Sequence, residues 1–573
     1  MTTLTAPSAA LVAQIHVAPG DIVPAGAPLL TTELMKMSHV LRADGPCRVE
    51  AVLVAAGDAL SEGQPLLTLA PADAAAPTAA IAQTDRPERA TLTARLTQLE
   101  DAARPDAVAK RHAKGLRTAR ENLADLLDPG SFAEFGALAV AAQRTVRDAA
   151  DLAARTPADG IVTGTGTVAG RPVAVLAVDY TVLAGTQGYF HHRKIDRMLE
   201  ACAHLPLVLY AEGGGGRPGD LDVDPLIAAG LTVPSFARFT AHRPLKIGIA
   251  AGYCFAGNAA LWGVCDIRIA TEGSNIGMGG PAMIEGGGLG QVAPGAIGPS
   301  HVQAANGVID LLVPDEAAAT AAARGLLSLS TPAGSTADTA ALREAVPADR
   351  TQAYDMRRFI GGLTDDFAEL RSAAGPGVIA GIARIGAQAT ALIANNPLHL
   401  GGAIDGPAAD KATWMLRLAA RLGLPVLSLI DTPGFMVGPE AEDAGQVAHA
   451  AALFQAGAAF TGPWVALITR KAYGLGAMAM AGGSLDRPHM TLGWPTAELG
   501  AMGLEGAVRL GFRAQLEAIA DPAERQAEYD RLLAQMYDRG SALNAASLLE
   551  FDAVTLPEDT PAALARAFAA AGG

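Results

Sequence analysis

Short apolar runs alternate with polar, glycine-containing turns along the chain, and in the first 70 residues this pattern occurs twice. The stretch Gln14-Ile15-His16-Val17 alternates polar and apolar side chains, as in a strand with one buried face. Residues 18–21 recur at 55–58 and residues 26–31 recur at 63–68, both with an offset of 37 positions. This repeat predicts two copies of a strand–turn–strand unit, and therefore a small all-β sandwich with pseudo-twofold symmetry.

A second and longer repeat occupies the rest of the chain, with an offset of 217 to 219 positions. Apolar runs at 170–178, 205–209 and 244–258 have counterparts at 387–396, 424–429 and 463–477. In each copy, short apolar strands alternate with helical stretches, which predicts a β/α unit with a mostly parallel sheet. The long repeat therefore predicts two α/β domains of the same fold, one after the other.

Two different segments lie between the short repeat and the long one. Residues 71–90 are rich in Ala and Pro and contain few large apolar side chains, which is typical of a linker. A linker of this length spans roughly 25 Å as a flexible coil. From Leu92 to Leu127 the pattern is mostly helical, with a break at Pro105. We therefore predict an all-β domain at 1–70, a linker at 71–90, and α/β domains at 91–330 and 331–573.

Composition and charge restrict the class of function. The chain has 573 residues and a net charge of −15, and it lacks a basic cluster that could neutralise phosphates, so a nucleic-acid partner is not expected. The longest uncharged run, Ile247–Cys265, contains Asn258 and several glycines, which favours a buried strand, turn and helix over a membrane span. The four cysteines lack metal-ligand or disulfide spacing, and no secretory signal is apparent. We expect a cytoplasmic protein without a membrane segment or a metal site.

The first candidate site is Lys36, which lies between Met35 and Met37 near the middle of the short repeat. A lone lysine is normally a solvated surface charge. This one falls in the hairpin that joins the two halves of the predicted sandwich, where flanking methionines have little purpose in folding. Exposed apolar side chains around a projecting lysine indicate recognition by another protein.

This domain resembles the biotinyl and lipoyl carrier domains, in which Met-Lys-Met is the biotinylated form of the motif. The resemblance implies that a biotin protein ligase attaches biotin to Lys36, with Met35 and Met37 as part of the motif. The residue before the first methionine is usually Ala, whereas this chain has Leu34. Lipoylated lysines usually have other neighbours, so the resemblance favours biotin.

The second candidate site is a pair of glycine-rich turns, one in each copy of the long repeat. Each turn follows a strand and opens a helix, at Gly252–Asn258 and at Tyr473–Ala477. Such turns can present backbone N–H groups to negative charge, and glycine permits a positive φ and close approach of a ligand. Asp431–Gly434 resembles a GTPase element but has no accompanying phosphate-binding loop, and His191-His192 lacks a second ligand pair at metal spacing. The turns therefore favour electrostatic stabilisation by backbone donors over side-chain acid–base chemistry.

Residues from about 91 to 573 resemble the carboxyltransferase subunits of biotin-dependent acyl-CoA carboxylases. These subunits consist of two α/β crotonase-like domains of the ClpP/crotonase superfamily. The stretches that carry the resemblance are His112–Gly115, Ala119–Glu121, Asp128–Phe132, His301–Gln303, Asn306–Asp310, Asp431–Phe435, Arg470–Gly474 and Trp494-Pro495. Together with the carrier domain, the resemblance covers nearly the whole chain.

The resemblance implies two oxyanion holes made of backbone donors. The N–H groups of Ala256 and Gly257 would form the first hole, and those of Leu475 and Gly476 the second. One hole would hold the acyl-CoA enolate and the other the ureido oxygen of biotin. Ala256 stands where many members have Gly, but a backbone donor survives that change.

Two further residues are implied to bind the substrate. Arg217 matches a position near CoA in relatives, although the residues that follow it, Pro218-Gly219-Asp220, differ from the family pattern. Met478 stands where members of the propionyl type commonly have Asp, so the acyl pocket should differ from theirs.

The function implied by the resemblance is transfer of CO2 from carboxybiotin to the α-carbon of an acyl-CoA through an enolate. The chain has no segment for ATP-dependent biotin carboxylation, so ATP, Mg and bicarbonate would act through a separate biotin carboxylase subunit. The active site would form between the N-terminal half of one subunit and the C-terminal half of another, which requires a homo-oligomer, either a dimer or a hexamer. Two alternatives stay open: a biotin-dependent acyl-CoA decarboxylase component with a membrane partner, and a non-catalytic scaffold that binds biotin and CoA.

Overall fold

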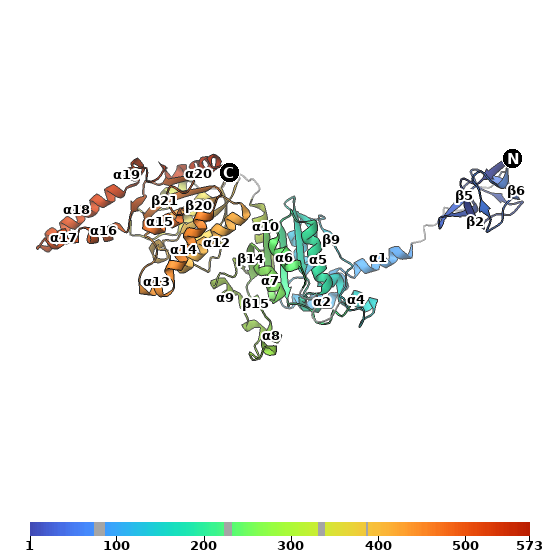
Figure 1. Cartoon of the computed structure of the whole chain (residues 1–573), viewed down its shortest axis with the longest axis horizontal. Helices are drawn as coiled ribbons and strands as arrows, with labels where there is room; N and C mark the ends of the chain where they lie inside the picture. The colour runs from blue at the N-terminus through green and yellow to red at the C-terminus, as the bar shows by residue number, and fades with distance from the viewer. Residues whose placement is uncertain (74–85, 223–231, 330–338, 386–387, 573) are drawn as a thin grey trace. The chain divides into compact units, whose positions relative to one another are not determined.

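The computed structural model describes residues 1–73, 86–222, 232–329, 339–385 and 388–572 (Figure 1). The chain divides into two compact units, Met1–Leu92 and Thr93–Gly573. Each unit has its own core, so each is described by itself.

The first unit is a sandwich of two four-stranded sheets, which confirms the fold predicted from the short repeat. Its core is built from leucines at equivalent positions of the two copies, Leu29-Leu30 and Leu66-Leu67, all with no exposed surface. One sheet has the order β1 (Thr2–Thr5), β8 (Pro65–Pro71), β6 (Cys47–Val52), β3 (Ile22–Val23), and the other β5 (Met37–Arg42), β4 (Pro28–Leu34), β2 (Ala10–Ile15), β7 (Ala59–Leu60).

The predicted linker, 71–90, ends too late. Helix α1 (Pro87–Thr97) already begins within it, and the remainder at 74–85 lies outside the described residues. Pro87 and Glu88 explain this start, because proline has the right φ for the first helical position and an acidic residue in the first turn is favourable. The boundary predicted at 330/331 also lies outside the described residues.

The second unit contains two halves with the same topology, which confirms the long repeat. In the first half the sheet order is β16-β14-β13-β12-β11-β10-β9, and β15 pairs with β13. The strand β11 pairs with β10 in antiparallel register, whereas all pairings from β11 to β16 are parallel. Its strands are β9 (Ala133–Phe135), β10 (Ile161–Val168), β11 (Arg171–Val178), β12 (Leu207–Gly213), β13 (Lys246–Phe255), β14 (Ile267–Thr271), β15 (Asn275–Gly277) and β16 (Leu311–Val313).

The second half repeats this arrangement, with sheet order β17-β18-β19-β20-β21-β22-β24 and β23 paired with β21. Each of its central strands lies 217 to 219 positions after its counterpart, as the sequence repeat predicts. The strands are β17 (Asp366–Leu370), β18 (Val378–Ile385), β19 (Gln388–Asn395), β20 (Val426–Thr432), β21 (Trp464–Tyr473), β22 (Met490–Gly493), β23 (Glu498–Gly500) and β24 (Ala553–Val554).

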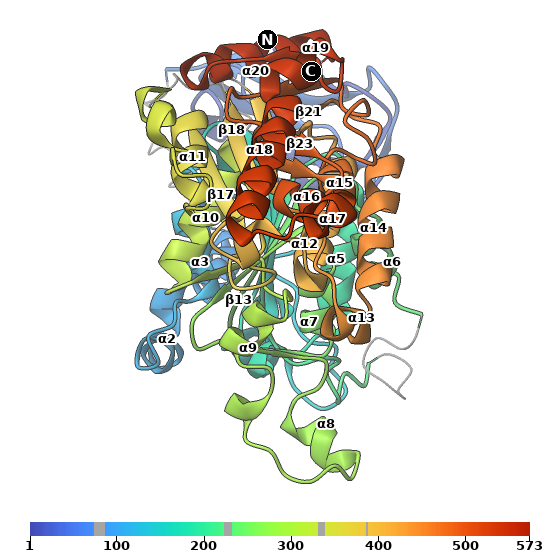
Figure 2. The same cartoon turned by 90° about the vertical axis from the view of Figure 1, so that its left-hand side faces the viewer.

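Helices cover both sheets. Those of the first half are α2 (Pro105–His112), α3 (Ala119–Leu126), α4 (Ala149–Arg155), α5 (Tyr189–Ala201), α6 (Ser235–Ala241), α7 (Gly257–Gly263), α8 (Pro281–Gly286), α9 (Ser300–Ala305) and α10 (Glu316–Ser328). Those of the second half are α11 (Met356–Leu363), α12 (Gly406–Leu422), α13 (Pro439–Asp443), α14 (Gln446–Ala459), α15 (Gly474–Met480), α16 (Leu504–Gly511), α17 (Arg513–Glu517), α18 (Pro522–Gly540), α19 (Ala542–Ser547) and α20 (Thr560–Ala570). In the first half, α8 projects away from the sheet on a long excursion of the chain (Figure 2), and in the second half α16 to α18 do the same (Figure 1).

The two halves share a core and an ion-pair cluster. Apolar side chains from β11 and β12 belong to the same buried cluster as those from β18 and β19. Asp310, whose side chain has no exposed surface, bonds Arg268 of the first half at 2.8 Å and Arg371 of the second half at 2.9 Å. Asp310 ends one of the stretches that carry the family resemblance, so part of that motif serves to join the halves.

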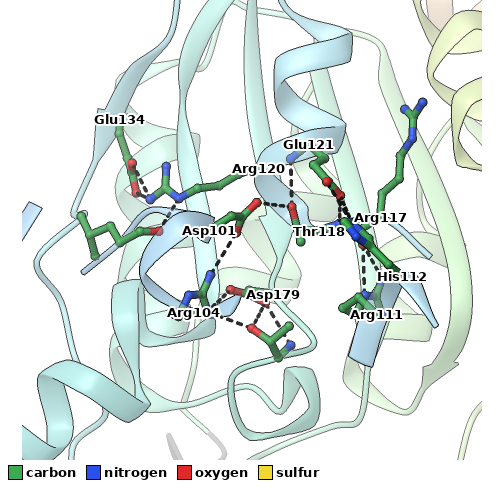
Figure 3. A network of polar contacts seen from close by, with 12 residues as sticks. Asp101, Arg104, Arg111, His112, Arg117, Thr118, Arg120, Glu121, Glu134 and Asp179 are labelled. Carbon is green, nitrogen blue, oxygen red and sulfur yellow. Dashed lines mark hydrogen bonds and ion pairs between the residues drawn. The ribbon is translucent and has the colours of Figure 1, made fainter. Parts of the chain in front are cut away.

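The stretches His112–Gly115 and Ala119–Glu121, which also carry the family resemblance, have a structural role as well. Thr118 caps α3 and forms a reciprocal capping box with Glu121, which also bonds His112 at 2.9 Å (Figure 3). Arg104 reaches Asp179 at the end of β11 at 2.9 Å. These contacts hold α2 against the carboxyl ends of the central strands, where the candidate site lies.

Candidate active site

Lys36 lies at the tip of a two-residue hairpin between β4 and β5. Leu34 pairs with Met37 across the hairpin, and both turn residues have positive φ, 51° at Met35 and 65° at Lys36. A tight hairpin requires this backbone geometry, but it normally selects Asn and Gly. Met and Lys in such a turn are strained, and strain at an exposed turn indicates a functional requirement.

The hairpin presents the lysine amine without covering it. Lys36 is exposed, Met35 is 90% exposed and Met37 is 66% exposed. A projecting primary amine between two accessible apolar side chains fits covalent attachment of biotin by another enzyme. The geometry therefore agrees with the role predicted for these three residues.

The two glycine-rich turns occupy equivalent places in the two halves. The first joins β13 to α7 and the second joins β21 to α15, and both strands are central in parallel sheets. In open parallel sheets, ligands bind beyond the carboxyl ends of the strands. Both turns lie at that edge of their own sheet.

The first turn differs from the prediction at one donor. The N–H of Ala256 donates to the carbonyl of Gly277 at 3.0 Å, because the short strand β15 pairs alongside β13. The N–H of Gly257 has no acceptor among the described residues. It faces Gly215, where a Cβ would lie 3.4 Å from the Gly257 nitrogen and 2.9 Å from the Cβ of Ala256. Gly257 is thus the unengaged donor, whereas Ala256 already has a partner.

In the second turn, the N–H groups of both Leu475 and Gly476 lack an acceptor within the described part of the chain. Gly476 packs directly on the loop that follows β20: a Cβ there would lie 2.7 Å from the Cα of Gly434 and 3.1 Å from the nitrogen of Phe435. Glycine is required at 476 because no side chain fits this approach. The side chain of Leu475 is 63% exposed and points away from this contact.

Arg217 is placed differently from a residue that contacts a ligand. It is only 2% exposed, and its guanidinium pairs with Asp159 and lies 3.6 Å from Asp220. It also donates to the carbonyl of Thr186 at 2.8 Å. Burial raises the pKa of Asp159, against the opposing effect of the Arg217 charge. Contact of Arg217 with a substrate stays a prediction, while its visible role is to hold the loop after β12.

A cavity of about 670 Å³ opens beside the first turn at the ends of β11, β12 and β13. Lys110 and Lys114 lie in its wall, and both are exposed without an ion-pair partner among the described residues. Deeper in the wall, Arg111 bonds Glu212 at 2.6 Å. Burial raises the pKa of Glu212 to about 7, opposed by its hydrogen bond and charge interaction with Arg111. The cavity therefore combines a buried Arg111–Glu212 pair with two exposed lysines, and Asp106 and Glu272 also line it.

A second cavity, of about 380 Å³, lies beside the second turn. Met478 lines it together with Leu485, Leu499 and Leu548. Met478 is 37% exposed, so its thioether is accessible from this space. The residue predicted to shape the acyl pocket thus lines a cavity of mixed character, which also contains Arg539 and Glu550.

Asn258 is a site residue that the sequence did not single out. It follows Gly257, is 1% exposed, and its side-chain amide contacts the neighbouring loops. An asparagine after a glycine turn gives no sequence signal of such contacts, because the acceptors are backbone carbonyls from distant positions. Lys110 and Lys114 were missed for a related reason, since isolated lysines resemble ordinary surface charges.

Other features of the described residues restrict the chemistry. All four cysteines are unpaired and buried, and His192 is hydrogen-bonded to Ser235. No cluster of three or more potential metal ligands occurs in the ranges that the structure describes. Within the same ranges, none of the helices combines the length and apolarity needed to cross a bilayer.

Comparison with known protein families gives two matches. Residues 110–572 match the carboxyl transferase domain, and residues 2–69 match the biotin-requiring enzyme domain. Among characterised proteins, the methylmalonyl-CoA carboxyltransferase 12S subunit of Propionibacterium freudenreichii subsp. shermanii is 31% identical over 437 residues, which cover 74% of this chain and 82% of that protein.

Solved structures similar to this chain include two acyl-CoA carboxylating enzymes or subunits. A single-chain, multi-domain long-chain acyl-CoA carboxylase matches with a TM-score of 0.80 and 47% identity, over 99% of this chain. This chain spans 56% of that protein's length. The transcarboxylase 12S structure, described as a hexamer with methylmalonyl-CoA bound, matches with a TM-score of 0.73 and 28% identity, over 85% of this chain and 96% of its own.

Proposed function

We propose, since this chain belongs to the carboxyl transferase family and begins with a biotin-requiring domain, that it transfers a carboxyl group from biotin to the α-carbon of an acyl-CoA. The observation that carries this proposal is the coexistence of an exposed Lys36 with two equivalent turns, each of which has at least one N–H donor without an acceptor among the described residues. A carrier lysine supplies the group to be transferred. Two separate donor sets match the two carbonyl oxygens that gain charge in such a transfer.

Lys36 would hold the biotin, which in its carboxylated form would supply the carboxyl group that replaces the α-proton of the acyl-CoA. The protein would stabilise the negative charge that develops on the enolate oxygen of the acyl-CoA and on the ureido oxygen of biotin during the transfer. A backbone N–H aimed at a developing oxyanion contributes about 3–4 kcal/mol in the transition state. We assign Gly257 to one hole and Leu475 with Gly476 to the other. No side-chain base is needed in this scheme.

The part of the larger cavity that carries Lys110 and Lys114 is the proposed place for the anionic end of CoA. Both lysines can approach phosphates as point charges on flexible stems. Gly252 and Tyr253 of β13 line the same cavity, so a pantetheine arm would lead from these lysines along β13 towards the first turn. Arg217 would then not contact the substrate, and its role would be to hold the loop that carries Gly215.

The cavity beside the second turn is the proposed place for the acyl chain. Met478 and three leucines give it apolar surface, although Arg539 and Glu550 also line it, and Met478 replaces the Asp common in propionyl-type enzymes. We therefore propose a long acyl chain as the substrate, as named for the single-chain relative. The rate should rise with the chain length of the acyl group.

The partners follow from what the chain contains. We propose that a separate biotin carboxylase loads Lys36 using ATP, Mg and bicarbonate, and that a biotin protein ligase modifies Lys36. We also propose a homo-oligomer, a dimer or a hexamer, since the 12S relative is described as a hexamer. A decarboxylase component uses the same two holes in the opposite direction and stays the second candidate.

Leu475 offers a test that removes a single backbone donor. In the variant Leu475→Pro the N–H is lost, while proline is tolerated in the first turn of a helix and Leu475 already has an exposed side chain. We expect a loss of about 10²–10³ in kcat, the usual effect of removing one oxyanion donor. The assay is biotin-dependent decarboxylation of a carboxylated acyl-CoA, which needs no partner enzyme.

The matched control is Leu475→Ala, which removes the side chain but keeps the N–H, and which should retain kcat within a few-fold. Equal activity in the proline and alanine variants would remove this hole from the mechanism. Absence of turnover in the wild-type protein with any acyl chain length would favour the scaffold alternative.

A further inference from the structure

We propose that Asn258 is a positioning residue that fixes the first oxyanion hole by holding three backbone segments against Gly257. This proposal rests on the proposed function, in which the N–H of Gly257 acts on the substrate. It adds a role for a side chain that makes no contact with the reacting atoms.

The side-chain amide of Asn258 lies where three loops meet. Its nitrogen lies within hydrogen-bond distance of the carbonyls of Gly185 at 2.9 Å, Glu212 at 2.9 Å and Gly214 at 2.8 Å, so its two N–H groups are shared among three acceptors. Because all three neighbours are carbonyl oxygens, only the amide nitrogen can face them. The amide oxygen accepts from the side chain of Gln187 at 2.9 Å. Every polar atom of the Asn258 side chain is therefore used, inside a site that is 1% exposed.

These segments also interlock through their glycines. A Cβ on Gly213 would lie 2.6 Å from the Cα of Gly185, and a Cβ on Gly185 would lie 3.1 Å from the Cα of Gly213. Gln187 donates its backbone N–H to Gly215 at 2.9 Å. The loop 213–216 is thus placed by Asn258 and Gln187, and Gly215 of that loop is the residue that faces the Gly257 nitrogen.

In the second half, the loop that faces the oxyanion hole is held without a polar side chain. The long repeat matches 244–258 with 463–477, so Ala477 stands where the first half has Asn258 and Gly476 corresponds to Gly257. Ala477 has no polar side chain, and Gly476 packs directly against Gly434 and Phe435. In the first half, the side-chain amide of Asn258 connects the corresponding backbone segments by hydrogen bonds. The two holes thus differ in construction: the first depends on one replaceable side chain, whereas the second depends on backbone packing.

The test compares Asn258→Asp and Asn258→Ser with the wild-type protein. The aspartate is nearly isosteric, but it loses the donors and places a carboxylate among three carbonyl oxygens, so kcat should fall on the order of tenfold to a hundredfold with little change in KM. Serine can still donate one hydrogen bond and should recover part of this loss. Protonation of the introduced carboxylate would also restore one donor, so the activity of Asn258→Asp, relative to wild type, should rise as the pH falls.

The control is Asn122→Ala, which removes a buried amide of α3 that donates to Glu316 of α10 at 2.8 Å and has no hydrogen bond to the loop 213–216. It should keep kcat close to that of the wild-type protein. Hydrogen exchange of the full chain provides a readout that does not depend on activity. Asn258→Asp should raise the exchange of 183–187 and 212–216, while 432–436 stays unchanged.

Unchanged exchange in 212–216, or increased exchange with unchanged kcat, would overturn the positioning role. A parallel loss in kcat for Asn122→Ala would also overturn it, because the effect would then be one of general stability. If wild-type turnover were absent while the exchange still rose in Asn258→Asp, the proposed reaction would fail and the holding contact would stand.

Discussion

In the first half, His192 is a buried titratable residue whose charge state is set by its surroundings. His192 is 5% exposed and its Nδ1 lies 2.7 Å from the hydroxyl of Ser235. Burial, reinforced by the nearby Arg217 charge, lowers the pKa of His192 to about 4. The imidazole is therefore neutral in the folded protein at pH 7, which excludes it as a charged ligand for an anionic substrate.

This shift predicts a pH dependence of stability. Between pH 6.5 and pH 4 the unfolded His192 binds a proton and the folded one does not, so the free energy of unfolding falls as the pH falls. From pH 7.5 to pH 5 the loss from this residue should be about 2 kcal/mol. The asparagine in His192→Asn does not titrate, so the free energy of unfolding of this variant should fall by about 2 kcal/mol less over the same pH range. Urea unfolding of both proteins at the two pH values measures the difference.

Comparing the two proteins removes the contributions that they share. His191 and Lys194 are also buried with lowered pKa values, but both are present in wild type and variant. An equal loss of stability in the two proteins would show that His192 is protonated, or exposed, in the folded state.

The residue scale is also where sequence reasoning had its limits. The turns at Gly257 and Gly476 were predicted from their glycines, since a close backbone approach leaves no other choice of residue. That Ala256 gives its N–H to Gly277 could not be predicted, because β15 has only three residues and pairs through tertiary packing. Arg217 was predicted near a ligand, but its burial depends on Asp159 and Asp220, which come from separate parts of the chain.

Elements were more predictable than single contacts. The strands β10 to β13 and β18 to β21 follow the repeat offset, because apolar runs of that length between turns have few alternatives. Helix α1 was missed at its start, since none of its residues is buried and it therefore has no apolar face to detect. The β4–β5 hairpin was predicted from the short repeat, but its strained turn was not.

The strain in that hairpin gives a prediction in which stability and function diverge. Met35 has a φ of 51°, a conformation that costs non-glycine residues roughly 1–2 kcal/mol. The variant Met35→Gly should therefore leave the unfolding free energy of the first unit unchanged or raise it by up to about 1 kcal/mol. We predict that the rate of biotin attachment falls, because Met35 is 90% exposed beside Lys36 and is a side chain that we propose the ligase contacts. Intact-mass time courses with a biotin protein ligase measure this rate.

Two further variants serve as the negative and the positive control for this experiment. Lys36→Arg should acquire no biotin, and Leu53→Ala, which changes an exposed apolar residue outside the hairpin, should react at the wild-type rate. Biotin on Lys36→Arg would contradict the carrier assignment. A wild-type rate for Met35→Gly would show that the methionine has no part in recognition.

At the scale of the whole molecule, the division of cores separates the carrier from the transfer site. The first unit buries its own leucines, whereas the two halves of the second unit share apolar clusters and the Asp310 ion pairs. The halves should therefore unfold together, and the carrier independently of them. Removal of the carrier should leave the transfer site intact.

A chain that begins at Arg86 tests this separation, since it retains α1 and loses only residues 1–85. It should keep the thermal unfolding transition of the second unit, carry no biotin, and still decarboxylate a carboxylated acyl-CoA when free biotin is added. Covalent attachment gives a tethered group an effective concentration that is typically millimolar. The truncated chain should therefore need about millimolar free biotin to match the biotinylated full-length protein. A folded truncated chain without turnover at saturating free biotin would show that the first unit contributes residues to the transfer site itself, beyond carrying the group that reacts there.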